Sequence, residues 1–232
     1  MINFTKPIIL GHRGLPSKER ENTLSSFKRA ISSKADGIEL DVHLTKDKKL
    51  AVIHDHNTKR TTGIDAVVEE LTLKELKQID SEIPTLREVF ETFGSSIIYD
   101  IEIKEKPFVF SNLPKLILDE IYSFHLEEKV MVSSFNPFPV RDFKRLCKTI
   151  PTAIIYDCVK SVPKILQHGQ GKYIAHPDFF KPGINIARKQ ITKLNKPCSV
   201  WCIDSKADYD YFIRNGAKII ITNRCDEIIN TL

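Results

Sequence analysis

The chain has 232 residues, of which 41% are hydrophobic and 28% charged, and its formal net charge is +5. This composition is ordinary for a soluble globular protein with one sizeable core. Lysines are spread along the chain, which excludes a basic nucleic-acid tail or membrane patch and leaves a mildly basic surface that favours anionic ligands.

Cysteine usage and the N-terminus indicate the compartment. The five cysteines are odd in number, have no metal-type CxxC spacing, and in several cases lie in apolar runs. Buried free thiols in a reducing compartment are therefore expected. The first residues, MINFTKPIILGHRG, contain no apolar stretch long enough for a secretory signal, and no segment could span a bilayer. We expect a cytoplasmic protein without stable membrane insertion.

A first strand and a first helix open the chain. The apolar run 7–11 predicts a strand that ends at His12 and Arg13. A polar loop follows. Asn22 is a good N-cap for a helix over residues 23–32, where apolar side chains recur at helical spacing.

The stretch 36–55, DGIELDVHLTKDKKLAVIHD, is the most informative. Apolar residues alternate there with Glu39 and Asp41, so both carboxylates lie on one face of a strand. Acids are depleted from strands and costly to bury unpaired, so the pair needs a cation or solvent. We expect His43 to lie in the loop beyond the strand. A turn over 45–49 then returns the chain as a hairpin, which brings His54 back towards the carboxylates.

The next segment is a polar excursion over residues 57–82, which we interpret as a small insertion with one short helix at 73–79. A helix from Pro84 to Phe93 follows it. The strand 96–104 then carries acidic and basic residues on one face: Asp100, Glu102 and Lys104.

From there strands and helices alternate to the end of the chain. Further strands are expected at 130–133, 152–156, 173–175, 198–203 and 217–222, and helices at 113–124, 140–147, 162–168, 184–194, 207–215 and 226–232. Alternation of this kind implies a parallel sheet, and eight strands in a chain of about 250 residues imply a closed barrel. We predict an α/β fold, a (β/α)8 TIM barrel forming a single domain over residues 1–232, with the insertion after strand two.

Active sites of such barrels lie at the C-terminal ends of the strands. Ionisable residues gather at that end, most densely on the first three strands: His12, Arg13, Glu39, Asp41, His54, Glu102 and Lys104. The strand expected at 173–175 ends in His176, a rim or structural residue. Three carboxylates without cysteine suit Mg²⁺ or Ca²⁺ better than zinc, and an arginine and a lysine beside them suit a phosphate. Two flanking histidines suit general acid–base catalysis, so the set predicts metal-assisted cleavage of a phosphate ester.

Each residue alone has a simpler interpretation. Glu102 and Lys104 could form an ordinary ion pair, and either histidine could be a hydrogen-bonded residue at a strand end. Trp201 could belong to the core or form a platform for a ligand. Serine hydrolysis is disfavoured, because the serines at 133–134 lack the glycines of a nucleophile elbow.

Taken together, the motifs resemble those of the glycerophosphodiester phosphodiesterase family. The matching segments are His12-Arg13-Gly14, Glu21-Asn22-Thr23, residues 36–42, His54-Asp55, Arg60-Thr61-Thr62, residues 83–86, residues 101–104, Ser134-Phe135, Trp201 and residues 221–223. Their order and spacing cover essentially the whole chain. One departure is Arg20, at a position where the family usually has proline, which concerns the conformation of that loop rather than the chemistry.

The resemblance implies a divalent metal, Mg²⁺ or Ca²⁺, on Glu39, Asp41 and Glu102. It implies His12 and His54 as the catalytic acid–base pair, without saying which is the acid. Arg13 and Lys104 would hold the phosphate, and Trp201 would lie near the substrate. The implied activity, in lipid and glycerol metabolism, is hydrolysis of glycerophosphodiesters, such as glycerophosphocholine or glycerophosphoethanolamine, to sn-glycerol 3-phosphate and an alcohol.

Two alternatives stay open. A lysophospholipase D or phosphoinositide-type lipase on the same barrel would need an apolar approach surface, for which residues 107–110 and Phe179-Phe180 are the candidates. A non-catalytic barrel that only binds phosphodiesters is the other, and the intact set of ionisable residues speaks against it.

Overall fold

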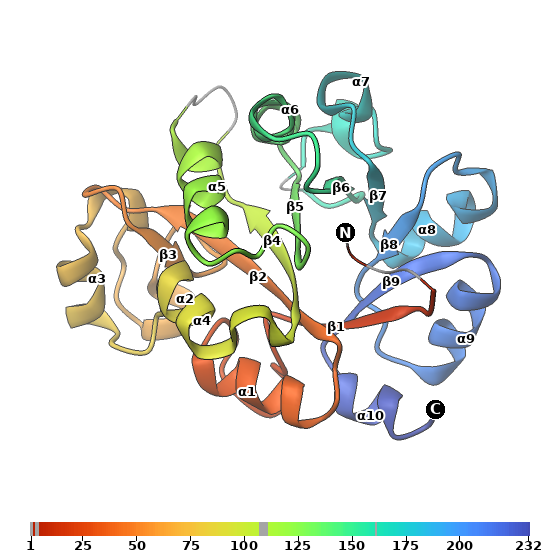
Figure 1. The fold of residues 1–232 in the computed structure, drawn as a ribbon, viewed down its shortest axis with the longest axis horizontal. Coiled ribbons are helices and arrows are strands. Elements are labelled where there is room, and N and C mark those ends of the chain that lie inside the picture. The colour runs from red at the N-terminus through yellow and green to blue at the C-terminus, as the bar shows by residue number, and fades with distance from the viewer. Residues whose placement is uncertain (1, 3–4, 107–110, 161) are drawn as a thin grey trace.

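The computed structural model describes residues 2, 5–106, 111–160 and 162–232 (Figure 1). Among these residues, one sheet contains nine strands: β1 (Ile8–His12), β2 (Gly37–Leu44), β3 (Leu50–Val52), β4 (Ile98–Ile103), β5 (Val130–Ser134), β6 (Thr152–Tyr156), β7 (Phe179–Pro182), β8 (Cys198–Val200) and β9 (Ala217–Thr222).

The sheet closes on itself. Its order is β1-β9-β8-β7-β6-β5-β4-β2-β3, and β1 also pairs with β2. All of these pairings are parallel except that of β3, which returns antiparallel along β2 as the second arm of a hairpin. In the described part of the chain the closed ring therefore has eight parallel strands, which confirms the predicted (β/α)8 TIM barrel. Such strands are buried on both faces, which explains their largely apolar sequences.

Helices lie outside the ring of strands, as Figure 1 shows. The α-helices are α1 (Leu24–Ser32), α2 (Lys59–Thr62), α3 (Leu73–Ile79), α4 (Leu86–Phe93), α5 (Leu113–Ser123), α6 (Pro137–Leu146), α7 (Lys172–Ala175), α8 (Ile184–Gln190), α9 (Lys206–Arg214) and α10 (Cys225–Ile229). Short 3₁₀ helices are η1 (Val68–Glu70), η2 (Gly94–Ser96), η3 (Lys164–Leu166) and η4 (Ile191–Lys193). Within the described residues, no helix is long and apolar enough to cross a membrane.

The segment between β3 and α4 contains α2, η1 and α3. Two of its helical boundaries are set by capping: Thr72 caps α3 and Thr85 caps α4, each with a glutamate three residues on that closes a capping box. Buried apolar residues under this segment form a small cluster of their own, separate from the main core: Ala51, Ile53, Val68, Leu76 and Ile83. This cluster anchors the insertion beside the end of the β2–β3 hairpin.

The region 157–182 differs from the prediction. The helix expected at 162–168 is only the 3₁₀ turn η3, and residues 173–175, expected as a strand, form the one-turn helix α7. The actual strand is β7, six residues further on, whose side chains are all buried. The apolar run Tyr173-Ile174-Ala175 was too short to distinguish a strand from a helical turn. His176, expected at a strand end, is instead the exposed C-cap of α7, with φ 46°.

Candidate active site

The register of the parallel strands brings the polar residues of β1, β2 and β4 to one level. His12 lies beside Glu39, and Glu39 beside Asp100. One step further along β2, Asp41 lies beside Glu102. Because alternate residues of a strand point to the same face, these side chains converge inside the barrel towards the C-terminal ends of the strands.

Three carboxylates meet there. Glu39, Asp41 and Glu102 each offer an oxygen atom, and these atoms lie within 4.8 Å of one another. The three residues are 1%, 0% and 6% exposed. In the described residues, no other trio of potential metal ligands meets this spacing. Buried carboxylates this close repel one another unless a cation lies between them, and a donor set made only of oxygen suits a hard divalent cation. The side chains therefore fit a metal such as Mg²⁺ or Ca²⁺.

Two cations flank this trio. Lys104 Nζ lies 3.0 Å from Asp41 Oδ1 and also contacts Glu102. Arg13 Nε lies 3.4 Å from Asp41 Oδ2, and the Arg13 backbone N–H donates to Glu39 at 3.2 Å. Burial alone would raise the pKa of Asp41, but Lys104 and then Arg13 hold that pKa well below its usual range. Asp41 is thus ionised, with its countercharges already in place.

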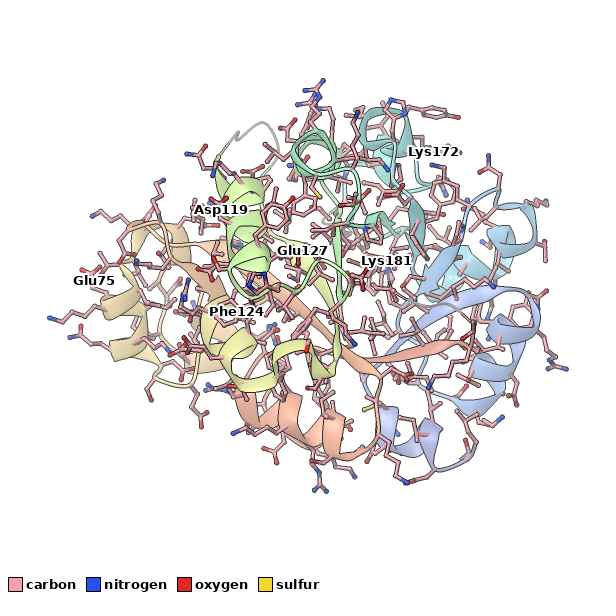
Figure 2. The ribbon with its side chains drawn as sticks, viewed as in Figure 1. Glu75, Asp119, Phe124, Glu127, Lys172 and Lys181 are labelled. Carbon is pink, nitrogen blue, oxygen red and sulfur yellow. The ribbon has the colours of Figure 1, made fainter. Side chains whose placement is uncertain are left out.

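A third cation, Lys181, was missed by the sequence analysis. It lies on β7, is 2% exposed, and ends 2.9 Å from Asp100 and 3.6 Å from Glu39. Its ammonium also donates to Ser133 Oγ at 3.1 Å, and Ser133 donates to Asp100. Figure 2 labels Lys181 in the interior of the molecule, whereas Glu75 lies at the periphery. A single lysine in the apolar run Phe179-Phe180-Lys181-Pro182 was the available signal, and the misplaced strand hid it.

His12 is held through its Nδ1 atom. Nδ1 lies 2.7 Å from Asn223 Oδ1, and Asn223 Nδ2 donates to Asp204 at 2.7 Å. Because the Asp204 carboxylate only accepts, the amide of Asn223 must present its oxygen to the histidine, so Nδ1 carries the proton. The other ring nitrogen, Nε2, faces Glu39 at 3.9 Å. Burial, assisted by the Arg13 cation, lowers the pKa of His12 to about 4.

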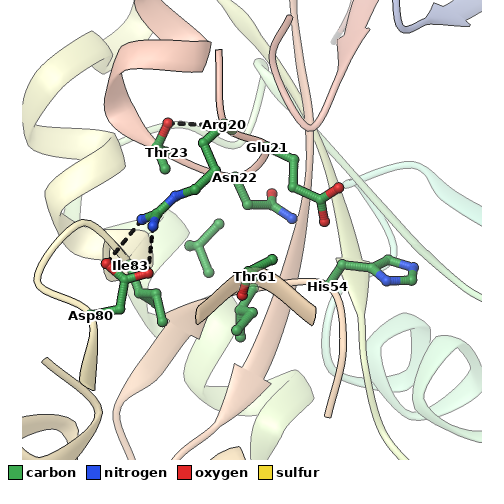
Figure 3. Close-up of a pocket in the computed structure, with 10 residues that line it drawn as sticks. Arg20, Glu21, Asn22, Thr23, His54, Thr61, Asp80 and Ile83 are labelled. Carbon is green, nitrogen blue, oxygen red and sulfur yellow. Dashed lines mark hydrogen bonds and ion pairs between the residues drawn. The ribbon is translucent and has the colours of Figure 1, made fainter. Parts of the chain in front are cut away.

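His54 is held in the same way by a charged partner. Its Nδ1 lies 2.6 Å from Asp55 Oδ1, and the other oxygen of Asp55 accepts from Arg60 Nε at 2.6 Å. The His54 side chain is 31% exposed and lines a pocket with Glu21 and Asn22 (Figure 3). Since Asp55 accepts at Nδ1, the Nε2 atom of His54 is left for a ligand.

His43 lies in a strand and not in the loop where it was expected. It is the seventh residue of β2, pairs with Ala51 of β3, and is 4% exposed, so it is not in a loop. Its ring nitrogens contact Glu69 at 3.0 Å and the backbone oxygen of His54 at 3.1 Å. The alternation of apolar residues continues through Val42 and Leu44, and the pairing with β3 keeps His43 within the strand. His43 therefore supports the backbone at His54.

Asn22 also has a different place from that predicted. The N-cap of α1 is Thr23, whose side chain accepts from the backbone N–H of Ser26. Asn22 is 3% exposed, has a left-handed backbone with φ 55°, and donates from Nδ2 to Asp41 Oδ2 at 2.8 Å. The residue thus points into the carboxylate cluster rather than along the helix.

Trp201 follows β8 and is partly buried. Its Nε1 donates to the backbone oxygen of Lys181 at 3.1 Å, and its ring packs edge-to-face on Phe135 with centroids 5.7 Å apart. These contacts fix the indole above β7. Its position at the C-terminal end of a barrel strand is the one that the sequence indicated.

The apolar rim considered for a lipase is not formed by Phe179 and Phe180. Both belong to β7 and are 5% and 3% exposed, so they are core residues. The other candidate segment, residues 107–110, lies outside the described residues.

Comparison with known proteins assigns the chain to a family. A sequence model of the glycerophosphoryl diester phosphodiesterase family matches residues 12–227. A glycerophosphodiester phosphodiesterase of Caldanaerobacter subterraneus subsp. tengcongensis is 34% identical over 240 residues, covering 97% of each chain. The crystal structure of a glycerophosphodiester phosphodiesterase from Thermotoga maritima superposes with a TM-score of 0.78 at 27% identity, covering 98% of this chain and 99% of that one.

A phosphodiesterase from Oleispira antarctica, solved in complex with the product sn-glycerol-3-phosphate, has the same fold, with a TM-score of 0.81 at 21% identity over 97% of this chain and 96% of that one. The match of the family model to nearly the whole sequence, together with the Caldanaerobacter relative, identifies the chain as a member of the glycerophosphoryl diester phosphodiesterase family.

Proposed function

We propose that this enzyme hydrolyses glycerophosphodiesters, such as glycerophosphocholine or glycerophosphoethanolamine, to sn-glycerol 3-phosphate and an alcohol, and that the reaction depends on a divalent metal. The observation that carries the proposal is the buried trio Glu39, Asp41 and Glu102 with Lys104 and Arg13 against it. Family membership supports the reaction class, and sn-glycerol-3-phosphate bound to the Oleispira antarctica relative supports the product.

Glu39, Asp41 and Glu102 would hold the metal, Mg²⁺ or Ca²⁺, through carboxylate oxygens only. When bound, such an ion supplies Lewis-acid polarisation and a template for the phosphate and a glycerol hydroxyl. Asn22 and Lys104 keep Asp41 oriented towards its two neighbours, because they contact different oxygens of that carboxylate. The chain's own part is thus to hold three carboxylate groups close together in a buried site.

Arg13 and Lys104 would bind the phosphate. Both side chains are largely buried, with 16% and 14% of their surface exposed, and both lie against the same carboxylate. A guanidinium can donate to two phosphoryl oxygens at once, and an ammonium acts as a compact point charge. In a site shielded from water they would stabilise the charge that develops on the phosphoryl oxygens.

The two histidines would transfer the protons. His12 suits the acceptor, because the pKa of about 4 keeps it neutral and its Nδ1–H is already used by Asn223. His54 suits the donor to the leaving alkoxide, because the carboxylate of Asp55 balances the charge of an imidazolium. Trp201 would form one wall of the substrate site.

Hydrolysis of water-soluble diesters is favoured over lipase action. A lysophospholipase D or phosphoinositide-type enzyme needs an apolar approach surface, and the phenylalanines considered for it, Phe179 and Phe180, are buried. A barrel that only binds phosphodiesters would not need His12 and His54 each held at Nδ1 by a hydrogen-bond partner. We also propose that residues 1–232 act as one domain and that the protein is cytoplasmic, the latter supported by five free cysteines.

A coupled assay for glycerol 3-phosphate tests the proposal. Glycerophosphocholine and glycerophosphoethanolamine are compared with lysophosphatidylcholine, each with chelator and after Mg²⁺ or Ca²⁺ is restored. Cleavage of lysophosphatidylcholine is followed by choline release, because its other product is an acylated glycerol 3-phosphate. We expect release from the first two and loss of release with chelator. Near-wild-type turnover in both His12→Ala and His54→Ala would refute the acid–base assignment, and absence of release with any metal would favour the binding-only barrel.

A further inference from the structure

A continuous chain of ion pairs joins the two halves of the site. Arg13 Nη1 donates to Glu21 Oε1 at 3.1 Å. Arg60 Nη1 donates to Glu21 Oε2 at 3.1 Å, and its Nη2 contacts Oε1. The same guanidinium uses Nε to reach Asp55 at 2.6 Å, and Asp55 accepts from His54. A single arginine therefore links the residue proposed to bind phosphate with one of the proposed proton-transfer histidines.

The five residues come from three separate segments. Arg13 and Glu21 belong to the connection between β1 and α1, and His54 and Asp55 follow β3. Arg60 alone lies on α2, within the 57–82 insertion. In Figure 3 the Glu21 carboxylate lies between Asn22 and His54 at the edge of the pocket. Arg60 is thus the residue by which the insertion joins this chain of ion pairs.

The contacts of Arg60 require a guanidinium. Three of its N–H groups are shared between two carboxylates, a pattern that a lysine ammonium on a flexible stem cannot reproduce. Glu21 and Asp55 are only 17% and 28% exposed, so the pairs are better shielded than surface ion pairs. Burial alone would raise the pKa of Glu21, but Arg60 and Arg13 hold it below its ordinary value. Both carboxylates are therefore ionised acceptors.

We propose that Arg60 is a positioning residue, which fixes Asp55 so that His54 presents Nε2 to the substrate and fixes Glu21 so that Arg13 faces Asp41. This inference rests on the proposed function only in treating Arg13 as a phosphate-binding residue and His54 as a proton-transfer residue. The ion-pair arrangement itself does not depend on the reaction. Arg60 would touch neither substrate nor metal, and its effect would pass through the two carboxylates.

Neighbouring ion pairs supply matched controls. Among the described residues, the ammonium of Lys59, beside Arg60 on α2, pairs only with the exposed Asp65 at 3.1 Å. Arg20 ties the same β1–α1 connection to Asp80 at 2.8 Å and to Glu82 at 3.1 Å. Arg20→Ala thus loosens the insertion against this connection without removing a member of the chain from Arg13 to His54. A general loss of rigidity and a loss of positioning can therefore be separated.

Kinetics on glycerophosphocholine give the first measurement. We expect Arg60→Ala to lower kcat about 10- to 100-fold, the scale of a slightly misplaced catalytic group, with a smaller change in KM. Arg60→Lys keeps the charge but not the three-way contact, so it should stay close to Arg60→Ala. Guanidinium ion in the buffer should restore part of the kcat of Arg60→Ala, because the site of the lost side chain is half exposed. Lys59→Ala and Arg20→Ala should keep the wild-type kcat.

Nitrogen-15 NMR gives a second measurement that needs no turnover. The neutral imidazole of His54, assigned by comparison with His54→Gln, should show the Nδ1–H tautomer in the wild type and a mixture of tautomers in Arg60→Ala. An unchanged tautomer and an unchanged kcat in Arg60→Ala would overturn the inference, and so would an equal loss of kcat in Arg20→Ala. If the wild type cleaves no glycerophosphodiester, the proposed function fails, while the tautomer comparison still decides the role of Arg60.

Discussion

Asn22 provides a prediction whose size follows from its contacts. Its side chain donates to the buried, ionised Asp41 at 2.8 Å, and its backbone has the left-handed φ of 55°. Replacing it by glycine removes the hydrogen bond but keeps a residue that adopts this conformation freely. Replacing it by alanine removes the bond and leaves a residue that adopts the left-handed conformation less readily than asparagine or glycine.

The two costs can be estimated separately. A hydrogen bond to a charged group contributes about 1.5–3 kcal/mol, so Asn22→Gly should lower the free energy of unfolding by about 2 kcal/mol. The left-handed conformation costs an alanine about 1 kcal/mol more, so Asn22→Ala should lose about 3 kcal/mol. The sharper prediction is that Asn22→Ala is less stable than Asn22→Gly, because within a helix or strand alanine is normally more stable than glycine.

Urea denaturation followed by circular dichroism, with chelator present in every sample, measures these free energies without a contribution from bound metal. Asn112→Ala is the matched control. Asn112 precedes α5, is exposed and makes no side-chain capping bond, so its loss should change stability by less than about 0.5 kcal/mol. A loss in Asn22→Ala as small as that of the control, or an Asn22→Gly less stable than Asn22→Ala, would refute the reasoning.

Three further predictions concern the same cluster. In the folded protein the pKa of His12 is lowered from 6.5 to about 4. The neutral imidazole therefore stabilises the fold fully above pH 6.5, and this stabilisation is lost as pH falls towards 4. Over this range the free energy of unfolding should fall by about 3 kcal/mol more in the wild type than in His12→Gln, as measured by acid denaturation. Lys181→Met leaves Asp100 buried without its cation and should cost about 3–5 kcal/mol, part of which Asp100→Asn in the same chain should restore; equal stability of the single and double variants would contradict this. Mg²⁺ at 100 times its dissociation constant should stabilise the wild type by about 2.7 kcal/mol in urea denaturation, and Glu102→Gln should show little of this gain; an equal gain in both would remove Glu102 from the metal site.

The alternation of strands and helices was enough to predict the barrel. The pairing of apolar runs with short helices holds along most of the chain, and a parallel barrel is the closed arrangement that buries both faces of such strands. Between 157 and 182 the same reasoning misplaced one strand, because two short apolar runs compete there and only tertiary packing selects the second.

The convergence of His12, Arg13, Glu39, Asp41, Glu102 and Lys104 could be predicted because each follows or lies within a strand whose register is set by the barrel. The residues that hold them in place were harder to find. Asn22 fits the usual preference for a helix N-cap, so its sequence position does not distinguish that role from contact with Asp41. Lys181 lies on the strand that was predicted six residues too early. Asp204 and Asn223 act through a contact between the segments that follow two different strands, which no local pattern announces.

The central proposal is that the buried carboxylates work with a bound cation on a phosphodiester. The direct measurement is the rate of glycerol 3-phosphate release from glycerophosphocholine by metal-stripped protein as Mg²⁺ or Ca²⁺ is added. We predict no release without metal, a rate that rises to saturation with one ion per chain, and no rise in Asp41→Asn. An undiminished rate after complete removal of metal would contradict the account.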